Sequence, residues 1–177
     1  MTQVFDIPVL LWIQEHLRSD ILTKILKVIT FFGDKGWFWI ALALFLLIFK
    51  KTRRMGLASC ISLAVCILIT NVTLKNLVAR IRPYDLTNAI VPIVERPDDF
   101  SFPSGHTCSS FAVSLILLRY DKRIGVPAVI FSSLIAFSRL YLGVHYPTDV
   151  IAGFLVAFVV SFIVCLIMKP RKKRFGR

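Results

Sequence analysis

Three short polar clusters lie at the edges of otherwise apolar runs, and their residue types suit the handling of phosphate. Lysine and arginine supply fixed positive charge, and arginine adds a planar fork of donors. Histidine can act as nucleophile or acid, and a carboxylate can orient it. The clusters are Lys75, Arg82, Pro83; Pro103, Ser104, Gly105, His106; and Ser138, Arg139, His145, Asp149. Together they predict one phosphate-handling site.

The composition indicates where this site works. Hydrophobic residues make up 56% of the 177 residues, charged residues 18%, and the mean hydropathy is +0.74. These values exclude an ordinary water-soluble domain and predict one compact all-α integral membrane domain. The net charge of +12 would suit nucleic acid if it coated one soluble face. Because the basic residues lie instead between hydrophobic runs, we expect membrane lipids and no nucleic acid as partners.

Hydrophobic runs predict a bundle of five transmembrane helices. The runs cover residues 36–49, 56–74, 107–118, 126–142 and 150–168. A span needs about 20 apolar residues, so the first helix is expected to begin earlier, near Phe31. The third run is also short, and its polar start needs protein or water around it.

The N-terminal stretch has a different pattern. Polar and apolar residues alternate with helical spacing over residues 20–32, which is typical of an amphipathic helix in the membrane interface. Ser19 is its expected N-cap, and Asp6 with Pro8 could start a preceding short helix. The alternative is a sixth span over residues 7–32. We thus expect an interfacial segment (1–35), a transmembrane domain (36–169) and a basic cytoplasmic tail (170–177).

Charge bias predicts the orientation. Thirteen of the 22 basic residues fall in three groups that five alternating spans place on one side: Lys50 to Arg54, Arg119 to Arg123, and Lys169 to Arg177. The positive-inside rule makes that side the cytoplasm. All three polar clusters then meet at the opposite face. We expect a bacterial plasma (inner) membrane protein with a cytoplasmic C-terminus and an extracytoplasmic site.

The first and third clusters each have a plainer interpretation. Lys75 and Arg82 are about two helical turns apart and could share a face before Pro83 stops the helix, or they could be snorkelling interfacial cations. His145 and Asp149 share a face if a helix begins near residue 146, although capping alone could explain them. A charge within an apolar run is costly and usually functional, as at Arg139.

The second cluster opens a predicted helix. Free backbone N–H groups and Gly105 favour the close approach of an anion there. Ser104 could be a simple N-cap. His106 favours the functional interpretation, because a histidine beside a bound anion is placed to protonate a leaving oxygen.

These motifs resemble the complete three-part signature of the type 2 phosphatidic acid phosphatase superfamily. They are Lys75-x6-Arg82-Pro83, Pro103-Ser104-Gly105-His106 and Ser138-Arg139-x5-His145-x3-Asp149, and no position departs from the pattern. The hydrophobic layout extends the resemblance to most of the chain. It implies a membrane-bound lipid phosphatase.

The resemblance also implies residue roles. His145 would attack phosphorus to give a phosphohistidine, Asp149 would orient it, and His106 would protonate the departing lipid oxygen. The expected phosphate-binding residues are Lys75, Arg82, Ser104, Gly105 and Arg139. The resemblance implies no metal and no cofactor, and the sequence shows no cluster with metal-ligand spacing.

The expected substrate is a lipid phosphate, most specifically undecaprenyl diphosphate. Phosphatidylglycerophosphate, phosphatidic acid and lipid A phosphate are the alternatives, and the oligomeric state is left open. The polar loop over residues 84–102 is expected to form a rim over the headgroup, with Asp98 and Asp99 in solvent. A competing class is a non-enzymatic membrane protein that binds lipid headgroups.

Overall fold

The computed structural model describes residues 3–169, and every regular element in this part of the chain is helical, as predicted. In chain order the elements are α1 (Gln3–His16), α2 (Asp20–Phe31), the 3-10 turn η1 (Asp34–Gly36), α3 (Trp37–Ile48), α4 (Arg53–Ile67), the π-helix η2 (Leu68–Leu74), α5 (Lys75–Val78), α6 (Pro83–Leu86), α7 (Gly105–Tyr120), α8 (Lys122–Tyr141) and α9 (Pro147–Met168). The predicted basic tail at 170–177 lies outside the described residues.

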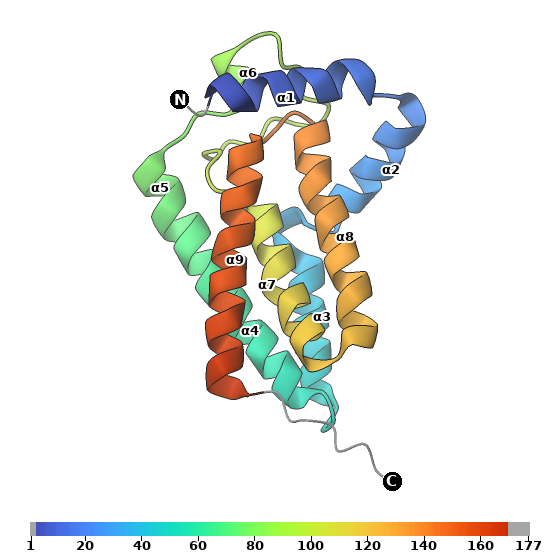
Figure 1. The fold of residues 1–177 in the computed structure, drawn as a ribbon, viewed down its shortest axis with the longest axis vertical. Helices are drawn as coiled ribbons and strands as arrows, with labels where there is room; N and C mark the ends of the chain where they lie inside the picture. Colours follow the sequence, from blue (N-terminus) through green and yellow to red (C-terminus); the bar gives the residue numbers. More distant parts are fainter. Residues whose placement is uncertain (1–2, 170–177) are drawn as a thin grey trace.

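The long helices form a bundle around α7. Figure 1 shows α3, α4, α8 and α9 running along α7, while α1 lies across the upper end of the bundle. Hydroxyl groups join the packed helices: Ser132 Oγ lies 2.9 Å from Ser114 Oγ, and Ser62 Oγ donates to the Ala112 carbonyl at 2.8 Å. Small polar residues of this kind let membrane helices approach closely.

Four stretches of the described chain are long and apolar enough to cross a membrane. They are Asp20–Ile48, Arg53–Leu86, Lys122–Tyr141 and Pro147–Met168. Large apolar side chains such as Leu44, Leu57 and Phe158 are exposed on their outer faces, where they suit contact with lipid. α7 has only 16 residues. Its polar start is buried within protein, which is the environment that its short apolar run required.

Helix starts follow the capping residues in the sequence. Ser19 caps α2 by accepting from the Leu22 N–H at 3.4 Å, and Ser104 caps α7 by accepting from the Thr107 N–H at 3.4 Å. α9 starts at Pro147, a residue whose fixed φ suits the first helical position. These starts place the second and third clusters at helix ends.

The expectation that Lys75 and Arg82 share one continuous helical face is wrong. α5 ends at Val78, and Ala79 adopts a left-handed conformation with φ of 46°. Arg82 is extended, as expected for a residue whose α conformation clashes with a following proline. The two cations are therefore brought together by an interruption of the helix, not by one continuous helical face.

Candidate active site

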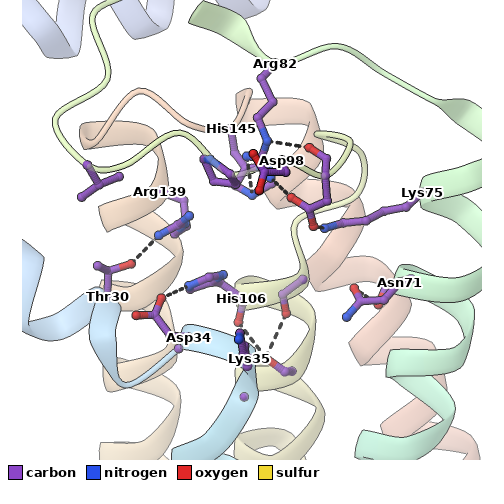
Figure 2. A pocket seen from close by; sticks show the side chains of 18 of the residues that line it. Thr30, Asp34, Lys35, Asn71, Lys75, Arg82, Asp98, His106, Arg139 and His145 are labelled. Carbon is purple, nitrogen blue, oxygen red and sulfur yellow. Dashed lines mark hydrogen bonds and ion pairs between the residues drawn. The ribbon is translucent and has the colours of Figure 1, made fainter.

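A cavity of about 760 Å³ lies between the start of α7, the η1 turn and loop residues 94–99. Figure 2 shows the basic and imidazole side chains gathered around it. Six of the eight predicted site residues line it: Lys75, Arg82, Gly105, His106, Arg139 and His145. The structure thus brings the three clusters together, as their spacing predicted.

Three buried cations surround one part of the cavity. Lys75, Arg82 and Arg139 are only 8%, 3% and 4% exposed. Arg139 Nη1 donates to Thr30 Oγ1 at 2.7 Å, while its Nε has no hydrogen-bond partner among the described residues. Because buried cations are costly without anionic partners, this part of the cavity is suited to an anion.

Asp99 supplies an anion from within the chain. Its carboxylate binds the Lys75 ammonium and the Arg82 guanidinium, although its side chain is 54% exposed. Partial burial raises the pKa of Asp99, but the hydrogen bonds and charges of Lys75 and Arg82 outweigh burial and lower the pKa to about 2. Asp99 is half exposed, as expected for a solvated loop, and its carboxylate also reaches Lys75 and Arg82 because the long loop folds back over the cations.

His145 is held against the signature carboxylate. Its Nδ1 lies 3.4 Å from Asp149 Oδ2, and its Nε2 lies 3.4 Å from Arg82 Nη1. Asp149 Oδ2 accepts hydrogen bonds from Ser101 Oγ at 2.5 Å and from the Tyr146 N–H at 3.0 Å. Among the described residues His145 Nδ1 makes no hydrogen bond, but the fixed carboxylate of Asp149 beside it favours the Nδ1–H tautomer.

Burial keeps His145 neutral. The side chain is 2% exposed, and burial lowers the pKa of His145 to about 3; Asp149 opposes the shift, whereas Arg82 and Arg139 add to it. A neutral imidazole carries a free lone pair at neutral pH. The residue is therefore in the state that a nucleophile requires.

His106 faces the same cavity and has a carboxylate of its own. Its Nε2 lies 2.8 Å from Asp34 Oδ1 in η1. A carboxylate at this distance can accept a hydrogen bond from the ring and so fixes the orientation of the imidazole toward the cavity. Sequence reasoning did not assign Asp34 to the site, although the charged pair between Gly33 and Gly36 was a usable signal.

Arg80 is a second residue that sequence reasoning missed. Its Nη1 donates to Asp149 Oδ1 at 2.6 Å, and its Nη2 donates to Asp6 Oδ2 at 2.7 Å. The guanidinium lies over the Tyr146 ring, 3.8 Å from its centroid. Asp6 also accepts from Thr148 Oγ1 at 2.6 Å and from the Thr148 N–H at 3.1 Å. The first turns of α1 and α9 are thereby joined behind the signature carboxylate.

Ser104 and Gly105 occupy different positions at the start of α7. The Ser104 hydroxyl accepts hydrogen bonds from the Thr107 N–H and from Thr107 Oγ1, and Ser104 does not line the cavity. Gly105 does line it, and a Cβ at this position would lie 3.0 Å from Asn71 Oδ1. The small residue thus leaves room for Asn71 beside the helix start.

The positive charge around the cavity comes from lysine and arginine. Within residues 3–169, no group of three or more His, Cys, Asp or Glu side chains could hold a metal ion. The cysteines in this range are free thiols.

Comparisons with known proteins agree with this geometry. The family model described as "PAP2 superfamily" matches residues 55–173, a range that contains every signature residue. The chain belongs to this superfamily. Two solved PAP2 proteins share its fold. The transmembrane PAP2-type phosphatidylglycerolphosphate phosphatase of Bacillus subtilis superposes with a TM-score of 0.78 at 26% identity over 98% of this chain and 89% of its own. Aquifex aeolicus LpxE superposes with a TM-score of 0.76 at 25% identity, over 92% of this chain and 95% of its own.

Three similar sequences are named as lipid phosphatases. Undecaprenyl-diphosphatase of Sulfolobus acidocaldarius is 39% identical over 73% of this chain, which spans 63% of that protein's length. Undecaprenyl-diphosphatase BcrC of Bacillus subtilis is 31% identical over 82% of this chain and 75% of its own length. Lipid A 4'-phosphatase of Bacteroides thetaiotaomicron is 33% identical over 67% of this chain and 59% of its own length.

Proposed function

We propose that this protein is a membrane-embedded lipid phosphatase that releases phosphate from a polyprenyl diphosphate such as undecaprenyl diphosphate. This proposal is supported mainly by two histidines that face one cavity: neutral His145, and His106 with its carboxylate partner. The buried cations Lys75, Arg82 and Arg139 line the same cavity. Such an arrangement binds an anion and supplies both a nucleophile and an acid. The names of the two undecaprenyl-diphosphatase relatives support the choice of substrate.

The proposed reaction has two steps. The lone pair of His145 Nε2 forms a bond to phosphorus while the bond from phosphorus to the leaving oxygen breaks, and His106 gives that oxygen a proton. Water then attacks the phosphohistidine, returns a proton to His106 and releases phosphate with cleavage of the P–N bond. Lys75, Arg82 and Arg139 stabilise the charge on the phosphoryl oxygens.

The proposed topology has five spans, with α7 as the central one. Basic groups between α3 and α4, between α7 and α8 and after α9 then lie in the cytoplasm of a bacterial cell. The cavity opens at the extracytoplasmic face, and residues 1–35, including α1 across the bundle end, form the interfacial segment. The limits 1–35, 36–169 and 170–177 remain our proposed segments.

Phosphate release by the purified protein tests the function. Wild-type protein should release phosphate from undecaprenyl diphosphate, and His145→Ala and His106→Ala should each lose at least about a hundredfold in kcat. A matched control is His16→Ala, because His16 is exposed on α1 and outside the cavity. Acid-labile, base-stable labelling of the wild type by a ³²P substrate would identify the phosphohistidine. Headgroup binding without phosphate release would instead favour a non-enzymatic protein.

A glycerophospholipid phosphatase is the second candidate. It is favoured by the structural match to the phosphatidylglycerolphosphate phosphatase, which covers 98% of this chain. A lipid panel compared by kcat/KM, including phosphatidylglycerophosphate, phosphatidic acid and a lipid A phosphate, distinguishes the two proposals. The polyprenyl diphosphate should have the highest value.

A further inference from the structure

The cavity is larger than one phosphoryl group and extends past His106. In Figure 2, His145, Arg82 and Arg139 lie above His106, whereas Lys35 lies below it on the opposite side. Asn71 lies at about the height of His106, to its right in this view, and both Lys35 and Asn71 line the cavity. Neither belongs to the three signature motifs, so the signature does not explain why they are there.

The geometry of the proposed reaction gives the part of the cavity past His106 a use. Phosphoryl transfer places the attacking and leaving atoms roughly in line on opposite sides of phosphorus. With His145 attacking, the leaving oxygen lies at His106. In a diphosphate that oxygen bridges to a second phosphorus, which must lie farther from His145, on the side of Lys35 and Asn71. Building on the proposed function, we propose that Lys35 and Asn71 form a subsite for the second phosphate of a diphosphate substrate.

Lys35 has the charge and the freedom that this subsite needs. Among the described residues its ammonium has no hydrogen bond or ion pair, while the neighbouring carboxylate of Asp34 is engaged by His106. Its backbone is left-handed, with φ of 50°. A non-glycine residue in this conformation is strained, and such strain clusters at functional sites.

Asn71 reaches the cavity from a second unusual element. It lies in the π-helix η2, and π-helical segments frequently occur at functional sites. Its Oδ1 accepts from Thr70 Oγ1 at 3.3 Å and lies beside Gly105. Its Nδ2 has no partner within the described chain and is a neutral donor for a phosphate oxygen. A cation and an amide therefore face one volume from two separate elements.

The proposed subsite makes the enzyme discriminate between prenyl diphosphates and prenyl monophosphates. In a prenyl monophosphate the leaving oxygen is attached to carbon, so no anionic group follows it past His106. Lys35 therefore contributes directly only to a substrate with two phosphates. A charge-assisted contact of this kind changes binding by about tenfold or more.

The experiment compares farnesyl diphosphate with farnesyl monophosphate in the same full-length enzyme. Lys35→Gln should lower the ratio of kcat/KM values, diphosphate over monophosphate, by about tenfold, and Asn71→Ala should lower it by about threefold. Lys35→Arg should restore most of the ratio. The control is Lys27→Gln, which removes an equal charge from an exposed position on α2 and should leave the ratio unchanged.

Two failures are distinguishable. If the wild type hydrolyses both substrates but Lys35→Gln lowers both values equally, or neither, the subsite is wrong and the proposed function stands. If the wild type hydrolyses the monophosphate and not the diphosphate, the proposed substrate class is wrong. The proposed subsite is then also wrong, because it depends on that substrate class. Activity on the monophosphate also shows that each variant is folded.

Discussion

Asp6 is expected to control the rate of the chemical step, although it lies in α1 and does not line the cavity. It is fully buried and binds Arg80, whose other terminal nitrogen binds Asp149 at 2.6 Å. Asp149 in turn orients His145 in the proposed mechanism. Asp6→Asn removes the charge at the far end of this chain of contacts with almost no change in shape.

The expected magnitude follows from what survives the substitution. Loss of one partner from a buried ion pair costs about 3–5 kcal/mol. Arg80 keeps its contacts with Asp149 and with the Tyr146 ring, so we expect a loss of about 2–3 kcal/mol in the free energy of unfolding. A shift of about 1 Å in a catalytic group can cost a hundredfold in rate, so kcat should fall by about ten- to a hundredfold. Asp6 is thus a positioning residue.

The assay separates positioning from folding. The variable to follow is the single-turnover rate of phosphohistidine formation, measured well below the Tm of the variant, together with KM. KM should change by less than about twofold, because the cations proposed to bind phosphate do not contact Asp6. Arg80→Lys should resemble Asp6→Asn, since an ammonium cannot bridge two carboxylates with a planar fork. Glu15→Gln, an exposed substitution on the same helix, is the control.

Two results would refute this reasoning. If Asp6→Asn lowers the Tm but forms phosphohistidine at the wild-type rate at low temperature, the contact between Asp6 and Arg80 only stabilises the fold. A rise in KM with unchanged kcat would likewise contradict it, because it would assign Asp6 to substrate binding.

Three further predictions concern the site itself. Asp99→Asn should lower the inhibition constant of orthovanadate by about fivefold, because a half-exposed carboxylate that competes for the cations is worth about 1 kcal/mol; an unchanged constant would show no competition. Gly33→Ala should lower kcat by at least about tenfold, since its Cβ would lie 2.6 Å from His106 Cδ2; wild-type kcat would contradict this. The ¹⁵N ring shifts of His145 should stay those of a neutral imidazole at pH 5. Because its folded pKa of about 3 lies below the unfolded value near 6.5, its contribution to stability is lost as pH falls from 6.5 towards 3; titration near 6.5 would contradict this.

Local patterns predicted the elements and much of the site. Runs of apolar residues located the long helices, and capping residues such as Ser19 and Ser104 located helix starts. The spacing of His145 and Asp149 predicted their shared face, and their atoms lie 3.4 Å apart. These predictions succeeded because each depends on interactions within a few residues along the chain.

The remaining features depend on contacts between distant segments. Asp99 returns to Lys75 and Arg82 only because the loop from α6 to α7 folds over the cavity, and loop paths have no periodic signature. The pairing of Asp34 with His106 joins residues 72 positions apart. No local pattern specifies such a pair.

The N-terminal segment has a part in the site that its sequence position conceals. The family model begins at residue 55, yet each proposed catalytic histidine depends on a carboxylate before that point. Asp34 contacts His106 directly, and Asp6 acts on His145 through Arg80 and Asp149. Asp6 is fully buried and Asp34 is bound to His106, so a role in the site explains both carboxylates better than membrane anchoring alone. We therefore propose that the first 36 residues complete the candidate active site.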